Sequence, residues 1–350
     1  MKLGEWSKLN VGEWSESYTF LKLIVDPLVV TCNHELQPID SDYATAKEVL
    51  LFDRSGKKSF RPKSTYKDYS AEETSTISWT SIKSELPSIL GELKAAHSNK
   101  GSFEMPRIER IFRRLGVESL KVQSTSKIDI EIVFEGTGPS QSPEGYSIKS
   151  LLSGAPTLLN ASRHTNFIFD VGGPQNIIAS RFKAVKFYKP FVDSLESDFG
   201  ELRFLRAHSP EFSENLRHYG EDFPEFLSSL VLQKFRTGKK VSLQDLVTVL
   251  VPISERSRRE FQLKNFLKSA ALGMVPGTRW SNQLQGYGGY LVVSPEGEIL
   301  RLPLKNEDSF CTYLYSNTFI DTPAKKLWIP PSEMNGRTEL SLNFSIRFMK

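Results

Sequence analysis

Several features are scarce in this chain of 350 residues, and each absence argues against a class of protein. There are only two cysteines, Cys32 and Cys311, far apart in the sequence. They disfavour a disulfide framework and a cysteine-built zinc site, and they suit a reducing cytoplasm. No apolar run approaches the roughly 18 residues of a membrane span, and the N-terminus lacks the apolar core of a secretory signal. We therefore expect a cytoplasmic protein with no membrane partner.

The signatures of several enzyme classes are missing as well. The five histidines show neither H-x-x-x-H nor H-E-x-x-H spacing, so the sequence gives no support to a zinc hydrolase. It contains no P-loop, no dinucleotide-binding Gly-x-Gly-x-x-Gly run and no G-x-S-x-G nucleophile elbow. The content is 39% hydrophobic and 25% charged, which is typical of a globular protein with one large domain or two ordinary ones.

Positive charge is concentrated near the N-terminus. The net charge is +4, and residues 51–70 alone hold six basic and two acidic side chains, an excess as large as that of the whole chain. Phe60 and Tyr66 are interleaved with these basic residues. The composition suits a phosphate backbone, although a solvated loop explains the same residues.

The distribution of apolar residues predicts an α/β fold with a mixed β-sheet flanked by helices. Helical spacing occurs in 13–25, in 106–115 and over most of 175–275. Alternation predicts strands at 127–136, 142–152, 166–173 and 340–348, and a hairpin at 288–304. We expect a core of residues 1–175, a mostly helical, DNA-contacting region of residues 176–275 and a C-terminal β element of residues 276–350 packed on the core. These regions form separate domains or one continuous domain.

A lysine stands on an otherwise apolar strand. In residues 142–152, Lys149 alternates with Tyr146 and Ile148. Burial of an ammonium group is costly unless an anion faces it. The position of Lys149 therefore calls for a nearby carboxylate.

An antiparallel hairpin with residues 127–136 supplies such a group. If residues near 134 and 145 pair, residue 129 falls opposite residue 149 or 150. Period-2 alternation then places Ile130 with Tyr146 on one face, and Asp129 with Lys149 on the other. We expect Asp129 to face Lys149, as a structural ion pair or as part of a metal-dependent nuclease site.

The nuclease interpretation follows from the needs of phosphodiester hydrolysis. A hard cation neutralises charge on the phosphate and acidifies a water molecule, and Mg²⁺ takes one or two carboxylates with waters. A nearby ammonium orients the water and offsets transition-state charge. Glu16 is aligned at helical spacing with Phe20 and Leu23, and it is our candidate for a second carboxylate. An ordinary glutamate in the first turn of a helix is the alternative.

The sequence resembles the HpaII-type restriction endonucleases, a branch of the PD-(D/E)xK nuclease superfamily. The resemblance rests on blocks in the same order along most of the chain: GEWSESYTFLKLI, KIDIEI, GYSIKSLLSGAPTLLNASRHTNFIF, GGYLVVSPEGEIL, YLYSNTFIDTP and LSLNFSIRF. It implies a prokaryotic, cytoplasmic type II restriction enzyme, a monomer or a homodimer, that cuts double-stranded DNA with Mg²⁺. It also implies a restriction-modification system with a cognate DNA methyltransferase as genetic partner.

The resemblance implies roles for individual residues. Asp129 matches the metal-binding aspartate, Lys149 the catalytic lysine and Glu16 the first-helix glutamate, while the carbonyl of Ile148 adds a neutral metal ligand. Ser147 departs from the pattern, because the superfamily has Asp or Glu there and a hydroxyl is a much weaker Mg²⁺ ligand. Glu16, Glu131 or Glu144 must then supply the second carboxylate, and we favour Glu16.

Two polar segments are candidates for DNA readout. Asn and Arg side chains suit the base edges of adenine and guanine. The first segment contains Asn160, Ser162, Arg163, His164, Thr165 and Asn166, and the second contains Arg279, Asn282, Gln283 and Gln285. A turn closed by its own side chains explains the first segment equally well. CCGG, which the family's name-giver reads, is our first hypothesis for the recognition sequence.

Two other functions remain open from the sequence. The first is a non-catalytic DNA-binding protein on a nuclease-like scaffold, because Ser147 stands where the superfamily has a metal-binding carboxylate. The second is a repair nuclease that reads DNA structure rather than sequence.

Overall fold

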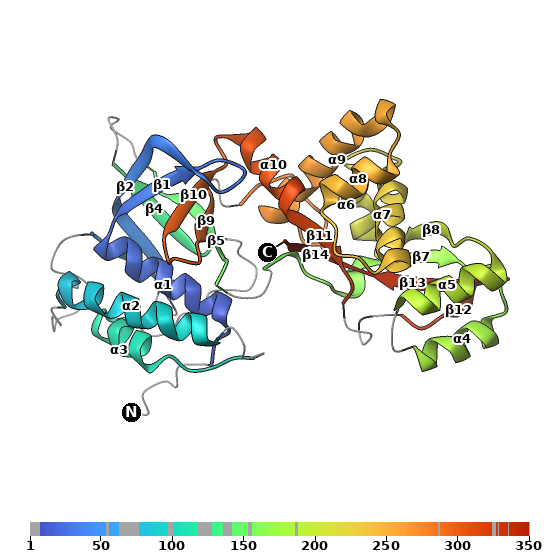
Figure 1. The fold of residues 1–350 in the computed structure, drawn as a ribbon, viewed down its shortest axis with the longest axis horizontal. Coiled ribbons are helices and arrows are strands. Elements are labelled where there is room, and N and C mark those ends of the chain that lie inside the picture. The colour runs from blue at the N-terminus through green and yellow to red at the C-terminus, as the bar shows by residue number, and fades with distance from the viewer. Residues whose placement is uncertain are drawn as a thin grey trace. The chain divides into compact units, whose positions relative to one another are not determined.

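The chain forms two compact units (Figure 1). The structure is a computed structural model that describes residues 8–53, 56–62, 77–96, 101–117, 128–135, 142–152, 156–185, 188–285, 288–323, 327, 329–334 and 336–349. The first unit is Met1–Pro156 with Leu284–Phe310, and the second is Thr157–Gln283 with Cys311–Lys350. These boundaries differ from those expected after residues 175 and 275, and the expected division stays a prediction. Residues 54–55 and 63–70 of the basic segment lie outside the described residues.

A mixed sheet forms the centre of the first unit. Its strands are Leu28–Cys32 (β1), Pro38–Asp53 (β2), Gly56–Phe60 (β3), Ile130–Phe134 (β4), Glu144–Ser150 (β5), Gly289–Val293 (β9) and Ile299–Pro303 (β10). Among the described residues their order is β1-β10-β9-β5-β4-β2-β3, and a further β1–β2 pairing closes six of the strands into a ring. Strand β5 is antiparallel to β4 and parallel to β9, so it lies inside the sheet.

Helix α1 (Val11–Val25) packs on this sheet. It begins at Asn10, whose side chain accepts from the Glu13 amide at 3.1 Å while the Glu13 carboxylate accepts from the Asn10 amide at 2.8 Å. This capping box satisfies two orphan donors of the first turn. Apolar residues on several sides of α1 are fully buried, Phe20 and Leu21 among them, and each contributes about 1.5–3 kcal/mol.

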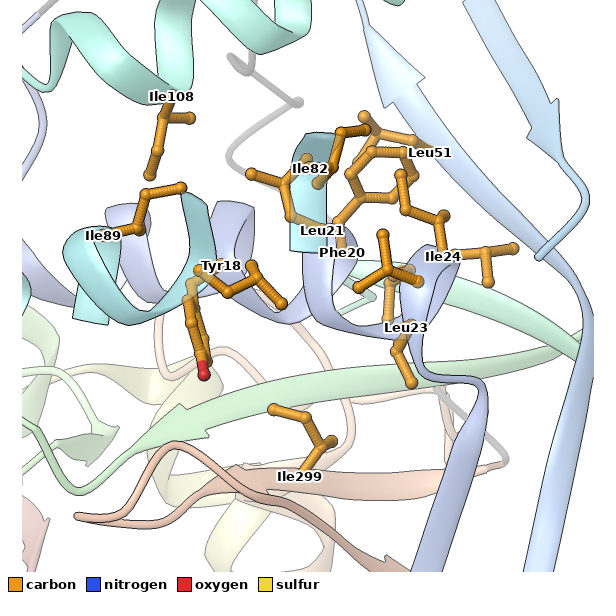
Figure 2. Close-up of a cluster of buried hydrophobic side chains, with 14 of the residues drawn as sticks. Tyr18, Phe20, Leu21, Leu23, Ile24, Leu51, Ile82, Ile89, Ile108 and Ile299 are labelled. Atoms are coloured by element: carbon orange, nitrogen blue, oxygen red, sulfur yellow. The ribbon is translucent and has the colours of Figure 1, made fainter. Parts of the chain in front are cut away.

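Two more helices cover α1 from the other side. They are α2 (Trp79–Ala95) and α3 (Pro106–Arg114). Figure 2 shows Ile89 and Ile108 of these helices on one side of α1 and Ile299 of β10 on the other. Helix α1 is therefore an inner element, which explains why its apolar residues occupy more than one stripe.

The second unit combines two small sheets with most of the helices. Its strands are Thr157–Leu159 (β6), Asn166–Asp170 (β7), Arg203–Ala207 (β8), Thr318–Asp321 (β11), Ser332–Met334 (β12), Arg337–Asn343 (β13) and Ser345–Phe348 (β14). Its helices are Arg163–Thr165 (η2, 3₁₀), Gln175–Ala184 (α4), Tyr188–Phe199 (α5), Pro210–Arg217 (α6), Phe223–Thr237 (α7), Leu243–Leu250 (α8) and Ile253–Ala271 (α9), while α10 (Glu307–Asn317) crosses the boundary between the units. The described strands form the orders β11-β14-β6 and β12-β13-β7-β8.

The expected α/β class with a mixed sheet is confirmed, and the two predicted helices and the hairpin at 288–304 are found as α1, α3 and β9–β10. Residues 340–348 are not one strand, because Phe344 separates β13 from β14 and these strands belong to different sheets. Strand β8 lies among the helices of the region expected to be mostly helical. Within residues 276–350, β9 and β10 complete the sheet of the first unit and β11–β14 belong to the second.

Candidate active site

The hairpin of β4 and β5 has the expected faces but a different register. Ile130 pairs with Tyr146, and both side chains are fully buried, as alternation predicts. The amide of Asp129 donates to the carbonyl of Tyr146 at 2.9 Å. Continuing this register places Asp129 opposite Ser147. The expectation that Asp129 lies opposite residue 149 or 150 is wrong.

Ser147 joins the two predicted catalytic residues. The Asp129 carboxylate accepts from Ser147 Oγ at 3.1 Å and from the Ile148 amide at 2.7 Å, in both cases through Oδ2. Lys149 Nζ donates to Ser147 Oγ at 2.8 Å. The ammonium and the carboxylate are thus connected through one hydroxyl, and Ser147 itself is buried. The residue that departs from the superfamily pattern is the central link of this chain of hydrogen bonds.

A tyrosine on the neighbouring strand supports the lysine. Parallel pairing places Tyr290 of β9 beside Ser147, and its ring centroid lies 5.0 Å from Lys149 Nζ. The ring is fully buried and packs edge-on against Phe310, with centroids 5.0 Å apart. A cation over an aromatic face is attracted by the ring quadrupole. Sequence analysis did not find Tyr290, because its role depends on pairing between segments about 140 residues apart.

Glu16 reaches the same site from α1. The helix is held to β5 by Ser15 Oγ, which donates to Ser150 Oγ at 2.8 Å, with both serines buried. Burial raises the pKa of Glu16 well above its ordinary value, the Asp129 carboxylate raises it further, and the Lys149 ammonium opposes both effects. Two like charges disfavour ionisation of both carboxyl groups, and a bound cation would offset this repulsion.

Glu131 and Glu144 are the other candidates for the second carboxylate. Glu131 forms an ion pair with Lys57 of β3, and Glu144 accepts from the hydroxyl of Tyr146 at 2.6 Å. Both carboxylates thus have other partners, whereas the charges of Asp129 and Lys149 both act on Glu16. The electrostatic coupling to Asp129 and Lys149 therefore makes Glu16 the better candidate for the second carboxylate.

The donor set fits a hard divalent cation. Within the described ranges, no group of three or more His, Cys, Asp or Glu side chains is placed to hold a metal ion. Two carboxylates and a backbone carbonyl nevertheless suit Mg²⁺, which usually keeps several waters and few protein ligands. Zinc, which takes four nitrogen or sulfur ligands in structural sites, fits this set less well.

The second unit brings the two predicted readout segments together. A Cβ atom at Gly277 would come within 2.9 Å of the His164 ring, so the loop after α9 packs against η2. Asn215 of α6 fixes this loop, because it donates to the Thr278 carbonyl at 2.8 Å and accepts from the Trp280 amide at 2.8 Å. The exposed residues of this surface are Asn160, Arg163, His164, Arg279, Asn282 and Gln283, and Ser162 is half-buried.

Two residues of the first segment point into the protein instead. Thr165 and Asn166 are fully buried. Thr165 Oγ1 accepts from the Ser162 amide at 2.9 Å, and the Asn166 amide group donates to the Arg163 carbonyl at 2.9 Å. Asn343 of β13 donates to the Ser162 carbonyl at 2.6 Å. In this structure Thr165 and Asn166 shape the turn and are not exposed to DNA.

The model of the HpaII restriction endonuclease family matches residues 10–348. The chain belongs to the HpaII restriction endonuclease family. A type II restriction enzyme, HpaII of Haemophilus parainfluenzae, is 30% identical over 359 aligned residues, which cover 97% of this chain and 98% of that protein. No solved structure matches the chain.

Membership of the HpaII family confirms the predicted resemblance and the predicted enzyme class, a type II site-specific deoxyribonuclease. Because this family consists of enzymes, the alternative that the chain is a non-catalytic DNA-binding protein is disfavoured. In the part of the chain that the structure describes, no helix is long and apolar enough to cross a membrane.

Proposed function

We propose that this HpaII-family chain is a Mg²⁺-dependent restriction endonuclease with a PD-(D/E)xK-type active site built from Asp129, Glu16 and Lys149. The observation that carries the proposal is the chain of hydrogen bonds from Lys149 through Ser147 to Asp129, with Glu16 in the same electrostatic environment. The order of α1, the β4–β5 hairpin and the parallel strand β9 supports a PD-(D/E)xK-like core.

Each residue has a stated role in this proposal. Asp129, Glu16 and the carbonyl of Ile148 would hold Mg²⁺, which when bound would supply an acidified water and positive charge beside the phosphate. Lys149 orients the attacking water and offsets negative charge on the phosphate. The hydroxyl of Ser147 fixes the lysine relative to Asp129. Because Ser147 carries no carboxylate, Glu16 is the second carboxylate of the site.

The DNA-contacting surface is proposed on the second unit. Arg163 and Arg279 are exposed, and an arginine reads the O6 and N7 atoms of guanine through two hydrogen bonds. A guanine-containing site such as CCGG is therefore the recognition sequence to test first. Arg279 is held by Glu214 at 2.6 and 2.8 Å, so DNA must compete with this carboxylate.

The remaining parts of the proposal concern partners. A palindromic site favours a two-fold dimer, and the host needs a cognate DNA methyltransferase to protect its own copies of the site. Double-stranded DNA is the substrate.

The test is digestion of a long, unmethylated phage DNA. The lanes contain wild type with Mg²⁺, wild type with EDTA, Lys149→Ala with Mg²⁺ and the matched control Lys47→Ala with Mg²⁺. Lys47 is an exposed lysine of β2. We expect discrete bands only for wild type and Lys47→Ala with Mg²⁺, and the sequenced ends give the site and the cut position.

Two results would contradict the proposal. Discrete bands with EDTA or with Lys149→Ala would show that the metal or the lysine is not needed. Intact DNA in every lane, from folded protein that still shifts DNA in a gel, would favour the DNA-binding protein. A smear would instead favour the structure-reading nuclease.

A further inference from the structure

The first unit contains a cavity of about 610 Å³ that the proposed reaction does not use. Its walls come from β2, β4, β5 and β10, four of the six strands of the ring, and from the residues next to them. Phe134 lines it at the opposite end of β4 from Asp129. Five residues of extended strand separate the two positions by roughly 17 Å. The cavity is thus distinct from the candidate active site.

Its most unusual group is a buried arginine. Arg301 is only 5% exposed, and its Nε has no hydrogen-bond partner among the described residues. The guanidinium lies over the ring of Phe134, 4.8 Å from the centroid. It also forms a hydrogen bond with the hydroxyl of Tyr146, which itself donates to Glu144 at 2.6 Å. The Nε–H donor alone is left without an acceptor, which is costly for a buried group, so the guanidinium gains from a ligand that supplies a further acceptor.

The rest of the lining excludes a simple anion as the best occupant. Lys305 adds a second positive charge at the cavity, but three carboxylates also line it, those of Asp42, which is half-buried, and of Glu135 and Glu144, which are exposed. These carboxylates would repel a phosphate or carboxylate group placed between them. A complementary ligand therefore presents acceptors to Arg301 and donors to the glutamates.

Two aromatic rings add a requirement of shape. Phe134 and Tyr43 line the same cavity, and Tyr43 is 62% exposed, which leaves its ring open to a ligand. Aromatic side chains bind flat ligands by stacking. A planar ligand with both acceptors and donors along its edge is a nucleobase, which proteins read by hydrogen bonds to that edge and by stacking.

We propose that this cavity binds a nucleobase, with Arg301 donating to ring or carbonyl acceptors and a glutamate accepting from an amino group. Tyr43 and Phe134 supply the stacking surface. The base belongs either to a free nucleotide or to a nucleotide unstacked from DNA. Phosphodiester hydrolysis at Asp129 and Lys149 needs none of these residues, so the inference goes beyond the proposed function.

The test is ligand-observed NMR with the full chain and dAMP, dCMP, dGMP and TMP in turn, with inorganic phosphate as the anion control. We expect saturable binding of at least one nucleotide. Arg301→Lys should weaken it about tenfold or more, because the guanidinium fork is lost. Lys47→Ala, a change outside the cavity, should leave it unchanged.

A second variant covers the case in which replacement of the buried arginine unfolds the chain. Tyr43→Ala changes an exposed ring and leaves the core intact. It should weaken nucleotide binding roughly fivefold or more, since stacking of one base contributes about 1–3 kcal/mol. Circular dichroism confirms that each variant is folded.

Three outcomes would overturn the inference: no binding of any nucleotide to folded wild type, equal binding of inorganic phosphate, or binding that Tyr43→Ala and a folded Arg301→Lys both leave unchanged. Competition by a 12-nucleotide single strand and by its duplex distinguishes the two sources of the base. If either DNA displaces the nucleotide, the base comes from DNA, and if neither does, the ligand is a free nucleotide. Lys149→Ala should keep nucleotide binding, so loss of cleavage and loss of this site are separable.

Discussion

Replacement of Ser147 by alanine tests the central geometric feature of the site. The change removes the hydroxyl that accepts from Lys149 at 2.8 Å and donates to Asp129 at 3.1 Å. Both partners are half-buried, so water replaces part of what is lost, and Asp129 keeps its bond from the Ile148 amide. We expect folding stability to fall by only about 1 kcal/mol.

The effect on catalysis should be larger than the effect on stability. Without the hydroxyl, Lys149 loses the contact that fixes its position, and a displacement of about 1 Å at a catalytic group can cost roughly a hundredfold in rate. We expect the single-turnover rate to fall roughly 10- to 100-fold, which is about 1.4–2.7 kcal/mol. DNA affinity should change little, because Ser147 is buried and contacts residues of the site.

The assay is single-turnover cleavage of a plasmid that carries the mapped site, at saturating Mg²⁺, with DNA binding measured in Ca²⁺. The matched control is Ser228→Ala, which removes another buried serine whose hydroxyl donates to the carbonyl of Glu225. Cleavage by Ser147→Ala within twofold of wild type would refute the idea that this hydroxyl positions the lysine. An equal rate loss in Ser228→Ala would show that the effect is not specific to the site.

Three further predictions concern pH, DNA and the readout turn. Because burial and the Asp129 carboxylate raise the pKa of Glu16, folded protein holds a proton that unfolded protein releases. The stability of the metal-free enzyme should therefore fall as pH rises from about 4.5 through the raised pKa. In Glu16→Gln the melting temperature should lose this dependence on pH. Parallel curves of melting temperature against pH for wild type and variant would contradict a raised pKa at Glu16. Arg279→Ala should weaken DNA binding in a gel shift roughly tenfold, whereas Glu214→Gln should tighten it by releasing the arginine. If both variants bind DNA with the affinity of wild type, Arg279 does not belong to the DNA-contacting surface. Asn343→Ala should lower the free energy of unfolding in urea by about 2 kcal/mol, and a loss under 0.5 kcal/mol would show that its hydrogen bonds are dispensable.

Much of the local structure follows from spacing along the chain. The helix predicted at 13–25 is α1, and the alternation around Ile130 and Tyr146 gives the correct faces of the β4–β5 hairpin. Such patterns are readable because helical and strand periods depend on residues only a few positions apart. The same alternation placed Asp129 and Lys149 on one side, and the structure connects them through one hydroxyl.

The register and the role of Ser147 required the tertiary structure. A hairpin register depends on its loop, and one or two residues of shift change which side chains oppose each other. The sequence identified Ser147 as a departure from the superfamily pattern, but only the observed pairing makes it the link between Asp129 and Lys149. Likewise, the sequence predicted an exposed arginine in the first readout segment. Burial of Thr165 and Asn166 was not predictable, because it depends on β13 packing against the turn.

Long-range pairing decided the rest. Tyr290 reaches Lys149 because β9 pairs with β5 across about 140 residues of sequence, and Arg301 lines its cavity because β1 and β2 close the ring of strands. The amino-acid sequence by itself determined the periods of the helices and strands, the helix caps, and the chemical types of the active-site residues. Which of these residues meet was decided only by contacts between distant segments, whose partners no local period specifies.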